Sequence, residues 1–333
     1  MKKLIVLATL AALPAAAMAD VVISGNLAVG IVNTKTSGEG SQTTEDRTSG
    51  EIKFAGKEDL GNGLKSIWQI ATKIDLADSK NYDPANALTA KNAPKNADVG
   101  NAWATRESFV GLQGDFGTVK LGNIYDMPTS GQLAIFEDLS ATYDSAIYDA
   151  GTRVNNTIAY VSPSIAGFTA TVQHSFGASK ADEAAKNHAQ TLSLAYEGEG
   201  FGVSYDGRRT KDSTLDKTGK LHELNASVSL DALSLVAGYA NAKDAAGDKR
   251  SGYGLSASYA MGNLTPKFGF WKEGDLKEAD GDRVNDGHKA FTVGVEYALS
   301  KRTRAGAQIT KVNYDDNDTA NLRRAMVYLG TKF

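Results

Sequence analysis

The sequence contains no cysteine, only six prolines, and no long apolar run beyond its N-terminal segment. Without cysteine no disulfide can hold the fold together, so an exported chain of this length must owe its stability to a large structure of its own. No stretch outside the N-terminal segment has the roughly 20 consecutive apolar residues that are typical of a transmembrane helix. The formal charge of −3 is too small to indicate nucleic acid as a partner, and no basic stretch is interleaved with aromatic residues.

The first 19 residues have the order of a secretory signal peptide. Two lysines precede an apolar run over 4–13, and the small residues Ala-Met-Ala occupy 17–19. Pro14 follows a run only half as long as the roughly 20 residues of a membrane anchor. We therefore expect residues 1–19 to be cleaved after export and the mature protein to comprise 20–333.

Strict alternation of apolar and polar residues recurs along the mature chain. It is clear in YGLSASYAM at 253–261, in AFTVGVEYAL at 290–299 and in LNASVSL at 224–230. A period of two over such lengths indicates β-strands with one apolar and one polar face. The whole chain is consistent with sixteen such strands.

The connections between these strands alternate in length. The short connections are at 60–63, 114–117, 162–167, 197–200, 231–232, 262–263 and 299–303. The long, polar ones are at 35–49, 77–101, 123–152, 177–188, 211–220, 244–250, 275–286 and 314–321. Seven short turns and eight long loops join sixteen antiparallel strands and leave both termini on the short-turn side.

Two all-β architectures could use these strands. A sandwich hides its apolar faces between two sheets, but here the other face is made of Ser, Gly, Thr and Asn, which would fill a core poorly. A barrel with lipid outside and water inside explains both faces, and aromatic residues near strand ends support it. We therefore predict an all-β fold, a 16-stranded antiparallel transmembrane β-barrel.

The chain ends in AMVYLGTKF, which alternates to its last residue, Phe333. Chain ends fray unless they are tied down, and a closed barrel has no free edge. We expect the last strand to pair with the first, which begins at Val21, and Phe333 to lie at the periplasmic interface. Phe333 would then contribute to barrel closure and assembly.

Several motifs resemble the general porins of Gram-negative bacteria, of the neisserial, β-proteobacterial type. They are EIKFAGKEDLGNGLKSIWQI (51–70), RESFVGLQGDFGTVKLGN (106–123), RVNNTIAYVSPSIAGF (153–168), LSKRT (299–303) and the terminal GTKF. The resemblance implies a water-filled trimeric barrel whose third long loop folds inward to narrow the pore. It also implies that the terminal aromatic residue is read by the outer-membrane insertion machinery, and that loop 77–101 latches onto a neighbouring barrel.

Residues alone point to the same third loop. Segment 123–152 has an apolar centre, GQLAIFEDLSATY, in which Leu133 and Phe136 are spaced as on one face of a helix. Such a loop favours a wall over open water, although a solvated acidic loop on the cell surface is the alternative. Its acids, the predicted acidic side of the pore constriction, are Asp126, Glu137, Asp138, Asp144 and Asp149.

Strand parity supplies the opposing charges. If Ile52 and Phe54 face lipid, Glu51 and Lys53 face the lumen, and the same rule turns Lys65 inward. It also turns Arg106, Lys120 and Arg153 inward and places Phe109, Leu121 and Tyr160 outside. The predicted basic side is thus Arg106, Arg153, Lys120, Lys53 and Lys65. The resemblance places Arg106 and Arg153 in the family's basic cluster, whereas Glu51 stands where the family usually has Arg or Lys.

The sequence contains no motif that indicates catalysis or a specific metal site. None of the four histidines lies in a Ser/His/Asp context, and neither G-x-S-x-G nor H-E-x-x-H occurs. The acidic runs 278–287 and 314–321 lack the order of a calcium loop. They are solvated loops or, alternatively, bridge to lipopolysaccharide through divalent cations. We expect no catalytic residues, metal or cofactor.

The sequence therefore predicts an outer-membrane porin for passive diffusion of small hydrophilic solutes and ions, with weak selectivity that leans towards anions. The alternative is a barrel that acts mainly as an adhesin or surface hydrolase. The expected partners are outer-membrane lipid and lipopolysaccharide, two further copies of the chain in a homotrimer, the insertion machinery and the permeating solutes.

Overall fold

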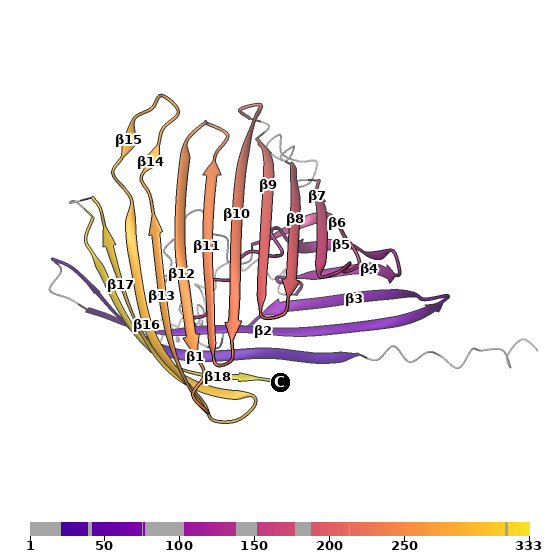
Figure 1. Cartoon of the computed structure of the whole chain (residues 1–333), viewed down its shortest axis with the longest axis horizontal. Helices are drawn as coiled ribbons and strands as arrows, with labels where there is room; N and C mark the ends of the chain where they lie inside the picture. Colours follow the sequence, from indigo (N-terminus) through magenta and orange to yellow (C-terminus); the bar gives the residue numbers. More distant parts are fainter. Residues whose placement is uncertain are drawn as a thin grey trace, which may run out of the picture.

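The strands of the chain form one sheet that curves until its two edges meet (Figure 1). The computed structural model describes residues 21–38, 42–74, 76, 103–137, 152–176, 188–212, 214–316 and 319–333. The predicted signal peptide and loop 77–101 lie outside these ranges. No helix among the described residues is long and apolar enough to cross a bilayer.

Sixteen long strands make up the described sheet. They are β1 (Val22–Thr36), β2 (Gln42–Gly61), β3 (Leu64–Lys73), β4 (Ser108–Gly114), β5 (Gly117–Tyr125), β6 (Arg153–Val161), β7 (Phe168–Ser175), β8 (His188–Gly198), β9 (Phe201–Asp212), β10 (Lys217–Leu230), β11 (Leu233–Lys243), β12 (Lys249–Tyr259), β13 (Leu264–Glu273), β16 (His288–Ala298), β17 (Thr303–Tyr314) and β18 (Leu322–Lys332). Two two-residue strands, β14 (Leu276–Lys277) and β15 (Arg283–Val284), extend the hairpin between β13 and β16.

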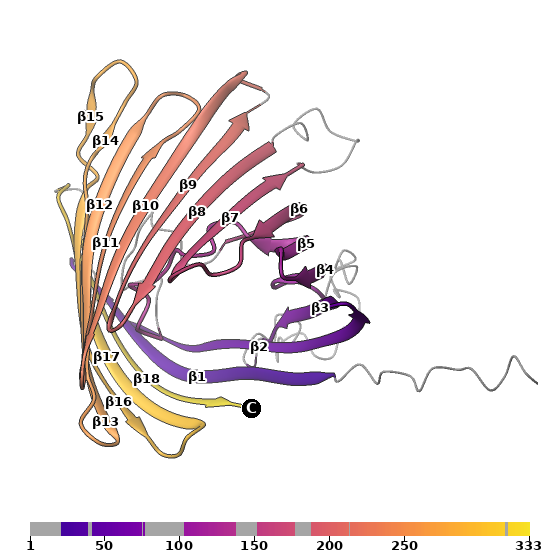
Figure 2. The ribbon, with the colours of Figure 1, turned by 45° about the vertical axis from the view of Figure 1, so that its right-hand side comes forward.

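The first and last strands close the barrel. β1 pairs with β18 from Asn26↔Lys332 to Thr36↔Leu322, and the two strands lie side by side in Figures 1 and 2. The pairing reaches the last residue, because Phe333 N–H donates to Gly25 O at 3.0 Å and Gly25 N–H donates to Phe333 O at 2.9 Å. All sixteen strands are antiparallel to their neighbours, so the predicted barrel is confirmed.

The alternation read from the sequence separates an apolar outer face from a polar inner face. In β16, Phe291 and Val293 are 42% and 56% exposed, while Thr292 between them is fully buried. Thr292 Oγ1 shares a 2.9 Å hydrogen bond with Thr310 Oγ1 of β17, another buried inner residue. Polar groups in the wall are thus satisfied across strands, and the exposed apolar side chains face outward, as lipid requires.

The short turns lie where the sequence predicts them, but several long loops are shorter than expected. β1 and β2 remain paired up to Lys35↔Gln42, so most of the predicted loop 35–49 is strand. β9 and β10 likewise pair up to Lys217↔Asp212, inside the predicted loop 211–220. These segments are polar, and a β-ladder needs no apolar face once it has left the bilayer. The polarity that suggested loops therefore marks the part of each hairpin beyond the membrane.

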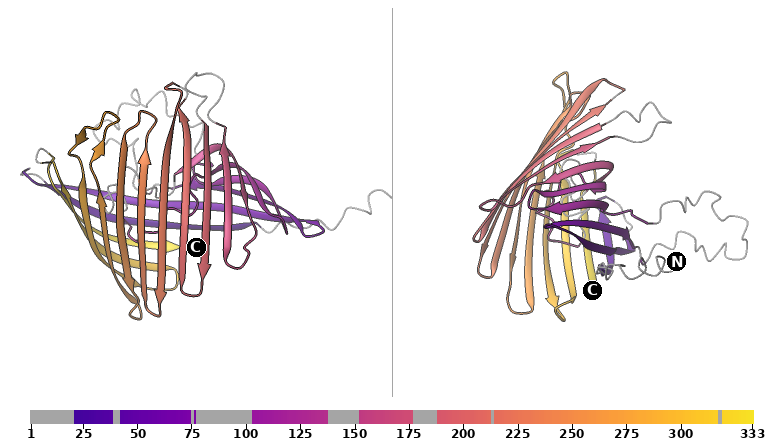
Figure 3. Two further views of the ribbon diagram at one scale, coloured as in Figure 1. Left: turned by 45° about the horizontal axis from the view of Figure 1, so that its top comes forward. Right: turned by 90° about the vertical axis from the view of Figure 1, so that its right-hand side faces the viewer.

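The wall is uneven in height (Figures 2 and 3). We call β4–β7, which are 7 to 9 residues long, the low wall. We call β9–β13, β16–β18 and β1, which are 10 to 15 residues long, the tall wall.

Candidate pore constriction

Residues 126–137, which follow β5, lie against the inner face of the tall wall. Their side chains and backbone contact inward-facing residues of β9, then β10–β13, then β16, β17 and finally β2. This part of the predicted loop 123–152 therefore crosses the interior. No helix forms within 123–137, although Leu133 and Phe136 are spaced as in one.

Carboxylates fix the start of this segment. Asp126, which is 2% exposed, accepts hydrogen bonds from the Arg208 guanidinium of β9 and from Thr191 Oγ1 of β8, the latter at 3.2 Å. Asp206 of β9 is fully buried and accepts a hydrogen bond from Thr129 Oγ1 at 2.5 Å. Buried carboxylates need such donors to offset the cost of leaving water. The loop therefore leaves β5 and is fixed at its start to β8 and β9.

Apolar side chains continue the contact. Leu133 is fully buried against β11, where a β-carbon added at Gly238 would lie 2.8 Å from Leu133 Cδ1. Phe136 lies over β13, where a β-carbon at Gly269 would lie 2.7 Å from Phe136 Cε2. Glycines in the inner wall therefore provide the room for both side chains. The apolar centre of the loop rests on the wall.

The described segment ends in an ion-pair network at Glu137. Glu137 Oε2 lies 2.9 Å from Arg304 Nη2 of β17, and Glu137 Oε1 accepts a 2.5 Å hydrogen bond from Ser49 Oγ of β2. Arg304 also lies 3.3 Å from Glu296, which pairs with Lys267 at 2.9 Å. Glu137 therefore has its own cation on the wall.

The basic side of the site gathers around Glu51. Its carboxylate lies 4.0 Å from Arg106 Nε, 3.9 Å from Arg153 Nη2 and 3.6 Å from Lys53 Nζ. Arg153 is held further by Tyr125, whose hydroxyl accepts a 2.5 Å hydrogen bond from Nη2 and whose ring centroid lies 4.3 Å from the guanidinium carbon. Three cations therefore share one carboxylate, and the cluster carries a net charge of about +2.

The remaining predicted bases lie elsewhere on the inner wall. Lys120 pairs with Glu107 at 3.6 Å and its Nζ lies 4.6 Å from the centre of the Phe109 ring. Lys65 stands opposite Asp59, close to the turn between β2 and β3. It is six residues from Ala71, which stands opposite Lys53, a separation of about 20 Å along the strand. Lys65 is not brought to the cluster around Glu51.

The position of Phe109 corrects one expectation. Parity counted from Arg106 placed Phe109 outside, but its ring faces inward beneath Lys120. Arg106 lies in a bend before β4, so alternation applies only from Ser108 onward. Val110, which is 64% exposed, is the outward residue.

Sequence reasoning missed several inner-face charges. They are Glu107, Arg208, Asp206, Lys267, Glu296 and Arg304. Parity could have found Arg304, because Ala305, Ala307 and Ile309 of β17 form the alternate set. Of the predicted acids, Asp138, Asp144 and Asp149 lie outside the described residues.

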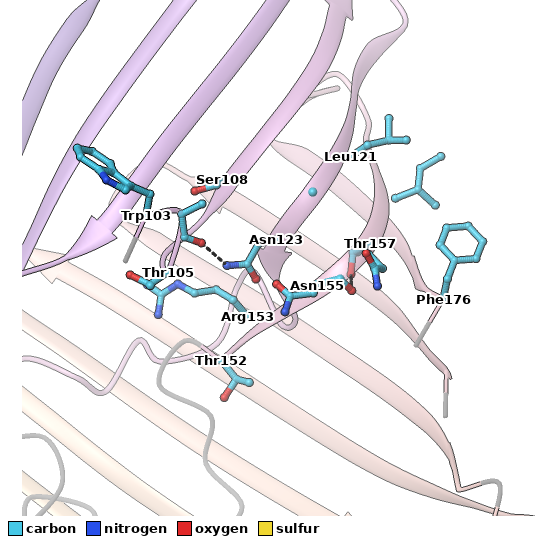
Figure 4. A pocket seen from close by; sticks show the side chains of 14 residues that line it. Trp103, Thr105, Ser108, Leu121, Asn123, Thr152, Arg153, Asn155, Thr157 and Phe176 are labelled. Atoms are coloured by element: carbon cyan, nitrogen blue, oxygen red, sulfur yellow. Dashed lines mark hydrogen bonds between the residues drawn. The ribbon is translucent and has the colours of Figure 1, made fainter. Parts of the chain in front are cut away.

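A cavity of about 1180 Å³ opens at the upper edge of the low wall (Figure 4). Polar groups of Asn123, Thr152 and Arg153 line one side, and Leu121 and Phe176 line another. Pairing between β5 and β6 slips here, since Gly122 faces Thr157 but Ile124 faces Val154. The cavity therefore marks a break in the ladder rather than a pocket in a packed core.

One acid of the upper hairpins is held by hydrogen bonds, and three others lie close together. Although partial burial favours the neutral acid, hydrogen bonds from Leu276 N–H and the Arg250 guanidinium hold the pKa of Asp286 below its usual range. Glu278, Asp280 and Asp282 gather their carboxylates within 4.8 Å of one another. Exposed acids of this kind need no ion.

Comparison with known proteins agrees with this arrangement. The family model of the Gram-negative porins matches residues 5–317. The chain is 31% identical to the major outer membrane protein P.IB of Neisseria lactamica, over 92% of this chain and 91% of that protein. It is 28% identical to the P.IB protein of Neisseria meningitidis serogroup A, with the same coverage of 92% and 91%.

Solved structures share the fold. An anion-selective porin from Comamonas acidovorans superposes with a TM-score of 0.72 at 21% identity, covering 95% of this chain and 100% of that one. Salmonella typhi OmpF, solved in complex with daunomycin, gives a TM-score of 0.73 at 17% identity over 95% and 98% of the two chains. With its closed sixteen-stranded barrel and a loop segment seated inside it, the chain belongs to the Gram-negative porins, channel-forming proteins of the outer membrane.

Proposed function

We propose that this porin admits small hydrophilic solutes and ions by passive diffusion and prefers anions weakly. The constriction is formed by the cluster of Lys53, Arg106 and Arg153 around Glu51, opposite the loop that begins at Asp126. Charged groups that line a narrow aqueous gap act on every ion that passes. Charges in distant loops are screened over a Debye length of roughly 8–10 Å. The mature chain's negative net charge therefore matters less than the local balance.

The observation that carries this proposal is the excess of cations around Glu51. Three basic side chains lie within 4.0 Å of one carboxylate. The described acids of the loop do not supply the missing negative charge there, since Asp126 pairs with Arg208 and Glu137 with Arg304. The net charge of the described groups around Glu51 is therefore positive. The name of the Comamonas acidovorans porin records anion selectivity for that protein; the preference proposed here rests on this chain's own residues.

Paired substitutions test this assignment. A unit charge about 8 Å from an ion in water contributes about 0.5 kcal/mol. Each cation attracts anions and repels cations by this amount, so the loss of both in Arg106→Ala with Arg153→Ala would change the anion-to-cation permeability ratio by about 2 kcal/mol without screening. Screening over a Debye length of about 10 Å at 0.1 M salt reduces this to about 1 kcal/mol, which lowers the ratio about fivefold. The measurement is the reversal potential across a salt gradient in a planar bilayer. The matched control, Arg106→Lys with Arg153→Lys, keeps both charges and should keep the ratio. An alanine pair that leaves the reversal potential unchanged would remove these residues from the constriction.

We further propose that three copies assemble through the low wall. A strand needs about 9–11 residues to cross a bilayer, whereas β4 has 7 and β7 has 8. Val110 and Val172 nevertheless point outward and are 64% and 55% exposed. A wall whose strands are at or below the length that lipid requires, but which is apolar outside, suits contact with another barrel. OmpT of Vibrio cholerae, similar in fold, is described in a trimer form.

The remaining partners follow from location. Outer-membrane lipid and lipopolysaccharide surround the tall wall, where exposed aromatic side chains such as Tyr259 and Tyr297 lie at or next to strand ends. The insertion machinery would read the C-terminal strand that ends at Phe333, whose ring is 44% exposed. The comparisons indicate a channel rather than an enzyme. An adhesin or surface hydrolase is the weaker alternative.

A further inference from the structure

Four cations stand side by side near the top of the tall wall. Lys220 of β10 lies opposite Arg209 of β9 on one side and opposite Lys243 of β11 on the other. Lys243 in turn lies opposite Lys249 of β12. Residues directly opposite one another in an antiparallel sheet project from the same face. With strands about 4.8 Å apart, these four residues, the cation row, extend about 14 Å across the wall.

The cation row is on the outer face. All four residues are exposed, whereas their neighbours of opposite parity point inward. Leu221 is 7% exposed, Arg208 pairs with Asp126, and Arg250 pairs with the buried Glu273. Leu224, Tyr239 and Tyr253 lie four residues from the row on the same face and are 48%, 46% and 52% exposed. The row therefore stands about 13 Å above the lipid-facing apolar band. It is on the side of the long loops, where β9–β12 run next to one another (Figure 1).

Nothing in the described chain neutralises the row. No described carboxylate lies within ion-pair distance of its four side chains. The acids in the adjoining turns are engaged elsewhere: Asp212 accepts Thr214 N–H at 2.8 Å and Asp244 accepts Gly247 N–H at 2.8 Å. Like charges directly opposite each other destabilise a sheet. An external anion would remove this repulsion.

The same arrangement recurs further round the tall wall. Arg323 of β18 lies between Lys311 of β17 and Lys35 of β1, and all three are exposed. The low wall has no counterpart, because Lys120 and Arg153, the two Lys or Arg residues of its strands, serve the interior. Outward cations therefore follow the part of the barrel that meets lipid.

We propose that Arg209, Lys220, Lys243 and Lys249 bind the phosphate groups of lipid A, the phosphorylated glycolipid of the outer leaflet. The acyl chains would lie against Leu224, Tyr239 and Tyr253, which distinguishes a lipid from free phosphate. Cations close to an anionic membrane surface each contribute to binding, about fivefold apiece. The inference rests on the lipopolysaccharide partnership proposed above and gives it a site that needs no divalent bridge.

The test uses delipidated protein in detergent with EDTA, titrated with bisphosphoryl lipid A and followed by native mass spectrometry. The variant is Lys220→Gln with Lys243→Gln and Lys249→Gln, and we expect its affinity to be about 100-fold lower than wild type. The matched control, Lys57→Gln with Lys301→Gln and Arg302→Gln, removes three cations near the short-turn end and should bind within about twofold of wild type. Dephosphorylated lipid A should bind wild type and variant equally weakly.

Three outcomes would overturn the proposal. One is equal affinity of the triple variant and wild type. Another is binding of lipid A to wild type only when EDTA is replaced by Mg²⁺, which would assign the contact to divalent ions held by loop acids. The third is competition by phosphatidylglycerol or inorganic phosphate at the concentration of lipid A itself, which would show a general anion surface.

Channel recordings distinguish an effect on the lipid A site from an effect on the pore. The row faces outward, so the triple variant should retain wild-type conductance and reversal potential while it loses lipid A. If the triple variant forms no channels, Lys243→Gln alone serves instead, with an expected loss of about fivefold. An unchanged affinity for that single variant, with the channel intact, would contradict the proposal and leave the proposed pore function standing.

Discussion

The low wall and the tall wall have the same alternation of residues but different surroundings. Val110 of β4 and Val293 of β16 are both outward valines, 64% and 56% exposed. β16 has 11 residues, enough to cross a bilayer, and β4 has 7. The outward cations of the tall wall have no counterpart on the outer face of the low wall. Strand length and charge together, rather than alternation, are the basis for our proposal that the tall wall meets lipid and the low wall meets protein.

The largest expected effect comes from placing a charge on each wall. Val293→Arg should destabilise the inserted barrel by about 2–4 kcal/mol, since an arginine near the bilayer midplane must leave water. Val110→Arg should leave the single barrel inserted but abolish the trimer, because the residue would lie between copies. Urea unfolding in lipid vesicles measures the first effect. Gel mobility without boiling measures the second.

Leucine at either position is the control, since it adds size without charge and should preserve both properties. Equal destabilisation of the inserted barrel by the two arginine variants would contradict the proposed difference between the low wall and the tall wall. It would show that lipid covers both walls.

A smaller effect is expected at the seam. Deleting Phe333 removes two backbone hydrogen bonds to Gly25, each contributing about 1 kcal/mol, together with an exposed aromatic ring. Assembly should fall while the channels that do form keep wild-type conductance. Phe333→Tyr preserves the aromatic ring and should assemble normally. Wild-type levels of trimeric deletion variant in the membrane would remove Phe333 from assembly.

Most of the fold could be predicted from the sequence because a period of two is typical of β-strands and does not fit a helix. The alternation at 253–261 and 290–299 indicated both the strands and their faces, and alternating turn lengths indicated the strand number. The heights of the hairpins could not be predicted. Outside the bilayer, polar residues such as those at 35–49 can form either a loop or a strand. In this structure most of them are strand, because β1 and β2 remain paired up to Lys35↔Gln42.

The site was predictable in part. Parity placed Glu51, Lys53 and Arg153 on the same face, and the structure brings the two bases within 4.0 Å of the Glu51 carboxylate. Parity assigns a face, however, and not a partner. Glu137 and Arg304 lie 167 residues apart, and their contact depends on the path of the loop across the interior. Parity also gives no position along the barrel axis. Lys65 shares a face with Lys53 but lies close to the short turn between β2 and β3, far from Glu51. Phe109 was misplaced because Arg106 precedes the strand whose parity it was used to define.

The most direct test of the account is the sign of the reversal potential of the wild-type channel across a KCl gradient. A local charge of about +2 around Glu51 should place that potential on the anion side at about 0.1 M salt. The preference should fade towards about 1 M, because the Debye length falls from about 10 Å to about 3 Å. A potential on the cation side at low salt would contradict the account, because it would mean that acids outweigh Lys53, Arg106 and Arg153 where ions pass.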